Sequence, residues 1–318
     1  MAAVSSPKNQ RRSAKSRRGR RAATLSPSQL AALSRVFSSA VFHDLAKRGR
    51  SALLYRLLTQ SSVLERCNSR STIADAFDAT LSMLKASDAR DEYVFRSALT
   101  NKVLLGRHSL RTAAMLNEFR AGMCKADIVI LNGTATVYEI KSERDSLTRL
   151  ENQVSNYRKV FASVNVVASE SHIEKVASAM PRDVGVLELS RRFTISVVRE
   201  AVDRPDQVCP LAILESLRTR EAASVLEMLG HAPPDVPNTR LRASLREQFA
   251  KLAPAKVHSA MVVTLKASRS LLKLSDLVQQ LPRSLHAAAL SVPLRESDRG
   301  RLLQAVATPL RSAAAWSA

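Results

Sequence analysis

The sequence predicts a mixed α/β core, in the order helix, three strands, helix, strand, with a helical segment on either side. Apolar residues recur with helical spacing before about residue 87 and after residue 202. Between these positions, short apolar runs bounded by turn residues alternate with further helical patterns, as in a mixed sheet covered by helices. The composition, with 45% hydrophobic residues, 8 Gly and 4% aromatic residues, favours helices over an all-β architecture.

The core elements can be placed individually. A helix is expected from Asp91, which can cap it, with an apolar stripe of Phe95, Leu99 and Val103. The short apolar runs then predict three strands, over residues 117–121, 126–131 and 136–141. A helix over 145–162 and a buried strand over 164–169 follow, and a helix and two more strands complete the core.

The composition shifts divide the chain into five segments. The first residues are rich in cations and lack periodicity, so we expect disorder there. Ser26 before Pro27 then starts a helix. The expected segments are a basic arm (1–25), a helical segment (26–87), the mixed core (88–202), a C-terminal helical segment (203–292) and a loosely ordered tail (293–318).

The net charge of +21 comes from 49 Lys and Arg against 28 Asp and Glu. Residues 1–22 hold eight of these cations and no acid, which leaves 41 cations against 28 acids, or +13, in the rest of the chain. A basic arm on a basic body indicates a polyanionic partner, most often nucleic acid. The alternatives are a charge that serves solubility and an Arg-rich coding bias.

Cysteines, histidines and apolar runs exclude several classes of protein. The three cysteines are far apart and form no Cys-x-x-Cys motif, which argues for a reducing compartment and against a zinc site. The six histidines show no metal-ligand spacing. No apolar run approaches the roughly 20 residues that span a membrane, so we expect a cytoplasmic protein without membrane contact.

Two acids and a lysine stand on a predicted hairpin at residues 125–145. Asp127 opens one strand, and Glu139 and Lys141 share a face at the end of the next, because strand side chains alternate. Two converging carboxylates need a cation, and Mg²⁺, or equally Mn²⁺, suits them. The carbonyl of Ile140 is a further candidate ligand. Lys141 would activate a metal-bound water or stabilise charge on a phosphate, which is the chemistry of phosphodiester hydrolysis. The alternative is a solvent-exposed hairpin face that merely carries these charges.

The hairpin turn constrains this interpretation. Asn132-Gly133 is typical of a two-residue type I′ turn, which would set Asp127 opposite Tyr138 and on the other face from Glu139. A three-residue loop over 132–134 sets Asp127 directly across from Glu139. We therefore expect an odd-length loop or a β-bulge.

Asp127, followed after eleven residues by Glu139-Ile140-Lys141, resembles the PD-(D/E)xK nuclease superfamily, with Ala126 in place of the motif's proline. The predicted order of elements is similar to that superfamily's restriction-endonuclease-like αβββαβ core. The resemblance is narrower to an uncharacterised bacterial and phage branch, and it covers residues 88–200. The matching positions are Asn117-Glu118, Lys125-Ala126-Asp127, Glu139 to Ser142, Asp145, Leu147, Arg149-Leu150, Gln153 and Tyr157.

The resemblance implies further site residues. Gln153 and Tyr157 match a Gln-x-x-x-Tyr step that borders the site in exonuclease-type members; the alternative is a surface stripe with a semi-buried tyrosine. Glu92 matches by position the glutamate that the first core helix often supplies; the alternative is a first-turn acid that favours the helix dipole. Glu118 is expected near Asp127, as a metal ligand; the alternative is a partner for Arg120 or Lys125.

These observations together predict a Mg²⁺- or Mn²⁺-dependent nuclease acting on DNA, with cutting from an end or internally left open. Arg107, Arg111 and Arg149 are expected to contact phosphates without reading sequence. One alternative is an inactive nuclease fold that binds DNA or recruits a partner, and another is a toxin or defence effector acting on RNA. The helical flanks are candidates for dimerisation or for binding a partner protein.

Overall fold

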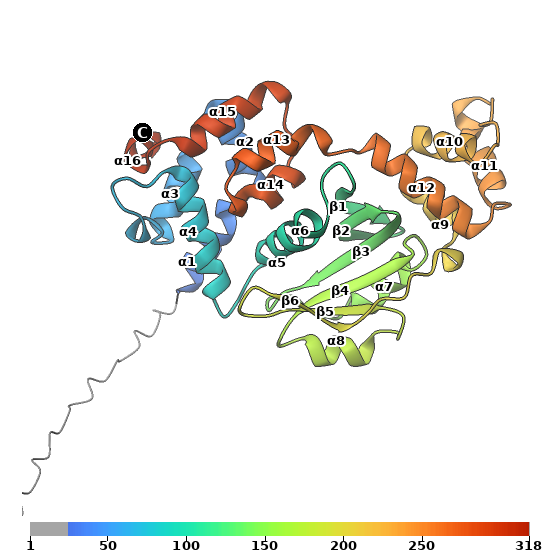
Figure 1. Cartoon of the computed structure of the whole chain (residues 1–318), viewed down its shortest axis with the longest axis horizontal. Helices are drawn as coiled ribbons and strands as arrows, with labels where there is room; N and C mark the ends of the chain where they lie inside the picture. Colours follow the sequence, from blue (N-terminus) through green and yellow to red (C-terminus); the bar gives the residue numbers. More distant parts are fainter. Residues whose placement is uncertain (1–24, 318) are drawn as a thin grey trace, which may run out of the picture.

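A six-stranded sheet occupies the middle of the chain and helices cover both of its faces (Figure 1). The computed structural model describes residues 25–317, so the predicted basic arm lies outside the described residues except for Leu25. The predicted mixed α/β class and the order helix, three strands, helix, strand are confirmed.

The strands follow one another in the sheet in chain order. They are β1 (Ala114–Ala121), β2 (Cys124–Asn132), β3 (Thr134–Lys141), β4 (Ser163–Ser169), β5 (Gly185–Leu189) and β6 (Ile195–Arg199). The first three form an antiparallel meander, β3, β4 and β5 run parallel, and β6 returns antiparallel. The two parallel steps need crossovers, and α7 and α8 supply them.

Helices precede, connect and follow the strands. Before the sheet lie α1 (Pro27–Val36), α2 (Ser39–Arg48), α3 (Ala52–Gln60), α4 (Ile73–Ala86), α5 (Glu92–Ala98), the π-helical turn η2 (Leu99–Leu104) and α6 (Leu105–Arg107). The crossovers are α7 (Leu150–Tyr157) and α8 (Ile173–Ala179). After the sheet come α9 (Pro210–Ser216), α10 (Thr219–Met228), α11 (Asn238–Phe249), α12 (Pro254–Ser268), α13 (Ser275–Gln280), α14 (His286–Ser291), α15 (Glu296–Ala307) and α16 (Leu310–Ala313). Among residues 25–317, every helix is too short or too polar to cross a bilayer.

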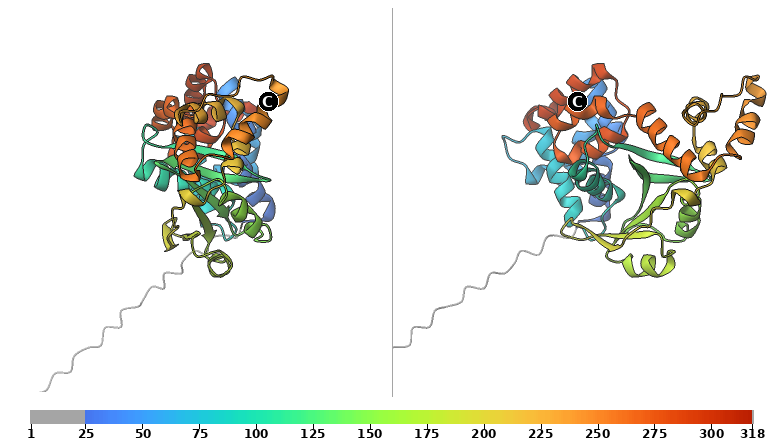
Figure 2. Two further views of the ribbon diagram at one scale, coloured as in Figure 1. Left: turned by 90° about the vertical axis from the view of Figure 1, so that its right-hand side faces the viewer. Right: turned by 45° about the vertical axis from the view of Figure 1, so that its right-hand side comes forward.

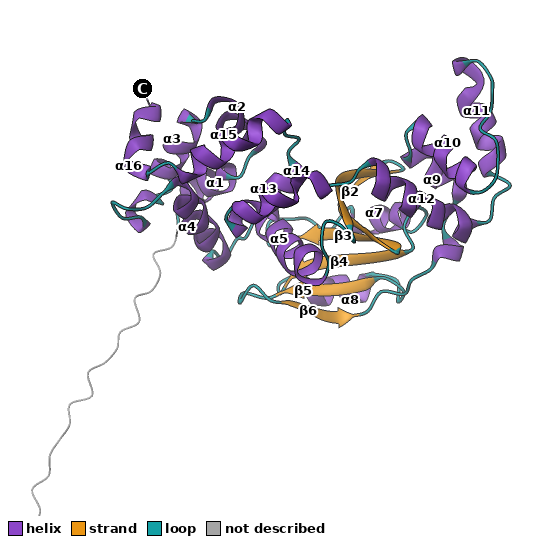
Figure 3. Ribbon diagram, turned by 45° about the horizontal axis from the view of Figure 1, so that its top comes forward, coloured by secondary structure: helices purple, strands orange, loops and turns teal. Residues whose placement is uncertain are grey.

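The sheet separates two apolar cores. On one face, Met115, Ile128 and Ile140 pack with α5 and with the helices at both ends of the described chain. On the other face, Val129 and Val137 pack with α7, α9 and α12. Figures 2 and 3 show the consequence: α1–α4 and α13–α16 gather on one side of the sheet, and α9–α12 extend on the other.

The C-terminal end of the chain corrects one prediction. The sequence pattern predicts loose order for residues 293–318, but α15 and α16 form there and pack against α2 and α4. Leu302, Val306 and Leu310 are buried, and the amide of Leu310 donates to the carbonyl of Ser71 at 2.8 Å. The prediction is wrong because the buried residues alternate with charged ones, and their partners lie more than 200 residues earlier in the chain.

Gly185 at the start of β5 is required by a close approach. A β-carbon there would lie 2.1 Å from Oδ1 of Asn165 and 2.9 Å from the backbone nitrogen of Ala201. We expect Gly185→Ala to lower the free energy of unfolding by about 1–3 kcal/mol, as overpacking does. The matched control is Gly300→Ala inside α15, where an added β-carbon would meet no atom within 4 Å other than its own helix backbone and chain neighbours. This substitution should leave the stability unchanged or raise it by up to about 1 kcal/mol. Urea unfolding of both variants measures the difference.

Candidate active site

The hairpin between β2 and β3 closes with an odd number of residues, as predicted. Asn132 pairs with Thr134 across the single residue Gly133, and the register continues to Ile128 opposite Tyr138. Gly133 has a φ of 73°, a left-handed conformation that glycine adopts without steric cost. The next position of this register sets Asp127 opposite Glu139.

The alternation of side chains between the two faces of β2 is interrupted at Asp127. Ile128 packs in one core and Val129 in the other, as strand alternation requires. Ala126 nevertheless packs in the same core as Val129, although an even spacing is needed for two strand residues to share a face. The irregularity turns the Asp127 side chain away from the face that regular alternation would give it. It also coincides with the end of the β2–β3 ladder.

Glu118 lies across from Asp127 on β1. The paired residues on either side of Glu118 leave it opposite Asp127, and its φ of 51° interrupts the strand there. A non-glycine residue with such a φ is uncommon in a strand. Glu118, Asp127 and Glu139 therefore form a row across β1, β2 and β3.

Helix α5 brings a fourth acid and a cation to this row. Asp91 caps the helix by accepting from the amide of Val94, which places Glu92 in the first turn. One carboxylate oxygen each of Glu92, Glu118 and Asp127 lie within 4.8 Å of one another. Arg96, one turn after Glu92, donates to Glu92 and to Glu118, the latter at 2.6 Å. Glu92 and Glu118 are half-exposed, so the acid cluster is open to solvent on this side.

Asp127 sits in the gap where β2 and β3 separate. Its Oδ2 accepts a hydrogen bond from the amide of Ile140 at 2.7 Å. The carbonyl of Ile140 points to the same side as that amide, because the two groups of one strand residue face the same neighbour. Burial, and then the nearby charge of Glu139, raise the pKa of Asp127 from 3.8 to about 8. A carboxyl group in this state has strong affinity for either a proton or a metal cation.

Glu139 is buried, with 1% of its surface exposed, and is held by three side chains. The ammonium of Lys141 lies 2.7 Å from Oε1, which confirms that Glu139 and Lys141 share a face. Gln153 donates to the same oxygen at 2.6 Å and accepts from Lys141 at 3.0 Å. Burial raises the pKa of Glu139, and Lys141 opposes the rise.

Tyr157 lies between two acceptors. Its hydroxyl oxygen is 2.8 Å from Oε2 of Glu139 and 2.7 Å from the carbonyl oxygen of Lys125. A phenol has one proton, so it can donate to only one of them. When Glu139 is ionised, the Tyr157 hydroxyl donates its hydrogen bond to the Glu139 carboxylate. When Glu139 is protonated, the carboxyl group can donate to the Tyr157 oxygen, and Tyr157 then donates to the carbonyl of Lys125. The hydroxyl thus accommodates either state of Glu139, and a surface stripe is excluded for this fully buried residue.

The four acids differ in their freedom to bind a metal. Glu118 pairs with Arg96 rather than with Arg120 or Lys125, so that alternative is wrong. Glu92 stands in the first turn of α5 and also joins the cluster with Glu118 and Asp127, so both interpretations of Glu92 describe its position. Both oxygens of Glu139 already accept hydrogen bonds, whereas Glu92 and Glu118 each bond to Arg96 through one oxygen.

The three predicted phosphate contacts are not gathered at the acids. Arg107 ends α6, Arg111 lies in the turn before β1, and Arg149 precedes α7. All three are exposed, and none bonds to a member of the acid row. Arg149 does not join Gln153 and Tyr157 at Glu139.

Two arginines that support the site were not identified from the sequence. Arg96 stands four residues after Glu92, a spacing that signals a helical ion pair, but nothing local shows that it also reaches Glu118. Arg90 is almost fully buried and binds Glu143 at 2.7 Å and the carbonyls of Leu189 and Ser190, both at 2.8 Å. Through these bonds Arg90 connects the segment that follows Lys141 to the end of β5.

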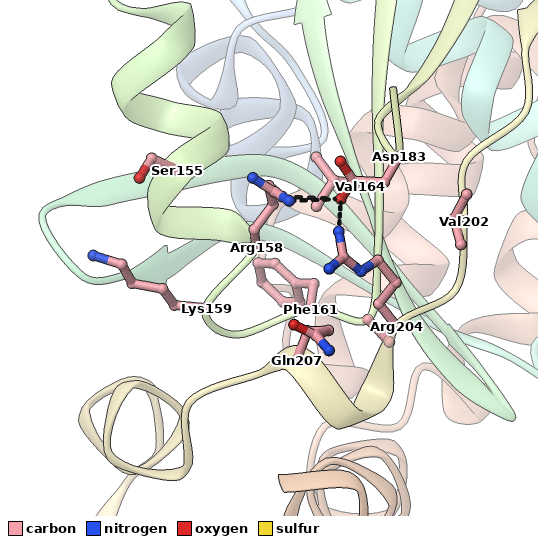
Figure 4. A pocket seen from close by; sticks show the side chains of 10 residues that line it. Ser155, Arg158, Lys159, Phe161, Val164, Asp183, Val202, Arg204 and Gln207 are labelled. Atoms are coloured by element: carbon pink, nitrogen blue, oxygen red, sulfur yellow. Dashed lines mark hydrogen bonds and ion pairs between the residues drawn. The ribbon is translucent and has the colours of Figure 1, made fainter. Parts of the chain in front are cut away.

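A pocket of about 240 Å³ lies elsewhere, between α7 and the start of β4. Figure 4 shows Arg158 and Arg204 both pointing at Asp183, with which they form ion pairs at 2.8 and 2.6 Å. None of the acids at the sheet row lines this pocket. Arg158 and Arg204 are already ion-paired with Asp183, and the pocket is separate from the acid row.

The fold and the site define a mixed α/β protein with a carboxylate row across its central sheet. The chain belongs to the bacteriophage P4 protein cII family, whose model matches residues 85–285. It is 32% identical over 102 residues to Protein cII of Enterobacteria phage P4; the match covers 31% of this chain and 38% of the phage protein. A solved protein of unknown function from Silicibacter pomeroyi is 19% identical, covering 38% of this chain and 84% of that one, with a TM-score of 0.26, which supports no inference about fold.

Proposed function

We propose that this protein is a divalent-metal-dependent nuclease that hydrolyses DNA phosphodiesters, with Asp127, Glu139 and Lys141 at the centre of its site. The observation that supports this most directly is the row of Glu118, Asp127 and Glu139 on three adjacent strands, with Glu92 beside it. The odd-length hairpin makes that row, and a two-residue turn would have separated its members.

The donor set fits Mg²⁺ or Mn²⁺. It consists of hard carboxylate oxygens, with the Ile140 carbonyl facing the same gap, and such oxygens are the ligands of these ions. Four ionised acids against Arg96 and Lys141 leave a local charge of −2, which one divalent ion balances. Glu92, Glu118 and Asp127 would hold the ion, with Glu139 joining them through the second lone pair of Oε2, which accepts one hydrogen bond, from Tyr157. A bound ion supplies charge neutralisation at the phosphate and a more acidic water.

The protein side chains have separate tasks around this centre. Lys141 stays close to Glu139 and presents its ammonium to the charge that develops on a phosphate oxygen. Gln153 and Tyr157 fix the Glu139 carboxylate by a hydrogen bond to each oxygen, so that it does not rotate during the reaction. Arg96 orients Glu92 and Glu118 through one oxygen of each, which leaves the other oxygens for an ion.

Incubation with defined nucleic acids tests the proposal. Linear, circular and single-stranded DNA, and RNA, are each incubated with the protein in Mg²⁺, in Mn²⁺ and in EDTA. We expect degradation of DNA with either ion and none in EDTA. Loss of circular as well as linear DNA would show internal cutting, and loss of linear DNA alone would show cutting from ends.

The hydrogen-bonded state of Glu139 favours a second candidate, an inactive nuclease-like fold that binds DNA. Both oxygens of Glu139 are engaged by the protein itself, which stabilises the buried carboxylate without a metal. Salt-dependent DNA binding with no cleavage under any ion would select this alternative. Degradation of RNA alone would instead indicate an effector that acts on RNA.

A further inference from the structure

We propose that Lys85, Lys102 and Phe193 form a second contact site, which binds backbone phosphates of the nucleic acid at a distance from the acid row. The identity of the polyanion rests on the proposed function. The site itself rests on a strained turn and on two lysines, from α4 and η2, that meet at this turn about a hundred residues later in the chain.

The turn between β5 and β6 holds Phe193 in an unfavourable conformation. The amide of Ser190 donates to the carbonyl of Thr194 at 2.9 Å, and the amide of Phe193 donates to the carbonyl of Ser190 at 3.0 Å. Phe193 has a φ of 59°. Hairpin loops of this length often end in a left-handed residue, and glycine suits that position best. A side chain there costs roughly 1–2 kcal/mol, so a phenylalanine at this position needs compensating contacts. Its ring packs against the helical core and faces two lysines.

Two ammonium groups approach that ring. The Nζ of Lys85, from α4, lies 4.1 Å from the ring centroid, and the Nζ of Lys102, from η2, lies 5.4 Å from it. In the part of the chain that the structure describes, neither amine forms an ion pair or a hydrogen bond with a side chain. The charge of Asp78 favours the charged form of Lys85, but the two side chains form no ion pair.

The arrangement has the properties of an anion site. Each cation gains from the face of the ring, by about 0.5–1 kcal/mol at an exposed position. Burial, and then repulsion from the charge of Lys102, lower the pKa of Lys85. An anion placed between the amines removes the repulsion. Phe193 is then a positioning residue: its ring holds the ammonium groups of two flexible lysines within 5.4 Å of its centroid.

The site is placed to contact the same nucleic acid as the acid row. Glu92 and Lys102 belong to one continuous helical run, from α5 into η2. Ten residues at 1.5 Å each separate them by about 15 Å along the helix. Phosphates on one strand of a duplex follow one another at about 3.4 Å along the axis. A substrate at the acid row thus presents another phosphate to the lysines about four or five nucleotides away.

DNA binding measured in EDTA tests the site without involving cleavage. Fluorescence anisotropy with single-stranded and duplex oligonucleotides, over a series of salt concentrations, compares the wild type with Lys85→Ala, Lys102→Ala and the double variant. The exposed Lys251→Ala is the control. Each lysine variant should bind severalfold more weakly, and on duplex DNA the slope of log K against log salt should fall by about 0.9 per lysine. The control should keep both the affinity and the slope of the wild type.

Phe193→Gly separates a binding role from a structural one. Glycine relieves the strain of the turn but also removes the packing of the ring against the helical core, so the thermal midpoint should fall. Affinity measured well below that midpoint should fall as in the double lysine variant, whose lysines are not part of this core. Unchanged affinity and salt slope in the lysine variants would overturn the site, even if the protein cleaves DNA. A reduced slope in a protein without nuclease activity would support the site and reject the proposed nuclease function.

Discussion

Asp127→Asn should abolish metal-dependent cleavage, by about a thousandfold or more, and should also stabilise the metal-free protein. The loss of activity follows from removing a charged ligand, since metal-ion catalysis contributes several kcal/mol to the barrier and each 1.4 kcal/mol is a factor of about ten. The gain in stability follows because the amide oxygen can still accept from Ile140 while the repulsion from Glu139 disappears.

The stability effect has a defined dependence on pH. Asp127 has a pKa of about 8 in the folded protein, against 3.8 for an unperturbed aspartate. Between these values the unfolded chain releases the proton and the folded protein keeps it, so the contribution of this group to stability falls as the pH rises through the window. The asparagine side chain of the variant does not titrate. The advantage of the variant should therefore be small near pH 4 and reach about 1–3 kcal/mol near pH 8.

Thermal unfolding in EDTA at pH 5, 7 and 8.5, together with the cleavage assay, measures both effects. The control is Glu247→Gln, an exposed acid on α11 that should change neither quantity. Wild-type cleavage by the Asp127→Asn variant would defeat the site assignment. An inactive variant that is also less stable would show that Asp127 supports the fold rather than the chemistry.

Local patterns predicted the elements that carry the acids. The apolar runs around Asp127 and Glu139 indicated the hairpin, and the demand that these two acids meet predicted its odd length, which Gly133 provides. Gln153 and Tyr157 were identifiable from the resemblance to a Gln-x-x-x-Tyr step, and residues four apart share the helix face that reaches Glu139. In each case the deciding relation spans fewer than about twenty residues.

The remaining features depend on distant parts of the chain. Arg90 meets the carbonyls of Leu189 and Ser190 about a hundred residues away, and no periodicity marks a buried arginine. The left-handed conformation of Glu118 has no local signal, since its own sequence indicates an ordinary strand residue. The last residues are held in part by a hydrogen bond from the amide of Leu310 to the carbonyl of Ser71, and these two residues meet only in the folded chain. Such contacts are set by topology rather than by local preference.

Lys141→Met should inactivate the protein and destabilise it by about 3–5 kcal/mol, the cost of leaving a buried carboxylate without its cation. Lys141 is 7% exposed and Glu139 is 1% exposed, so water replaces little of the lost interaction. The pKa of Glu139 is already raised by burial, and removing the ammonium raises it further. Protonation of Glu139 then relieves the unpaired charge at low pH, and the destabilisation should be larger at pH 8 than at pH 5.

A double-mutant cycle separates the pair from its surroundings. Glu139→Gln alone leaves a buried ammonium and should also be destabilising, whereas Glu139→Gln combined with Lys141→Met removes both charges and should recover most of the lost stability without activity. Urea unfolding of the four proteins gives the coupling energy. A double variant no more stable than Lys141→Met would show that the two groups do not stabilise each other. Retained cleavage in Lys141→Met would show that the reaction does not need the ammonium charge, and would assign Lys141 to the fold alone.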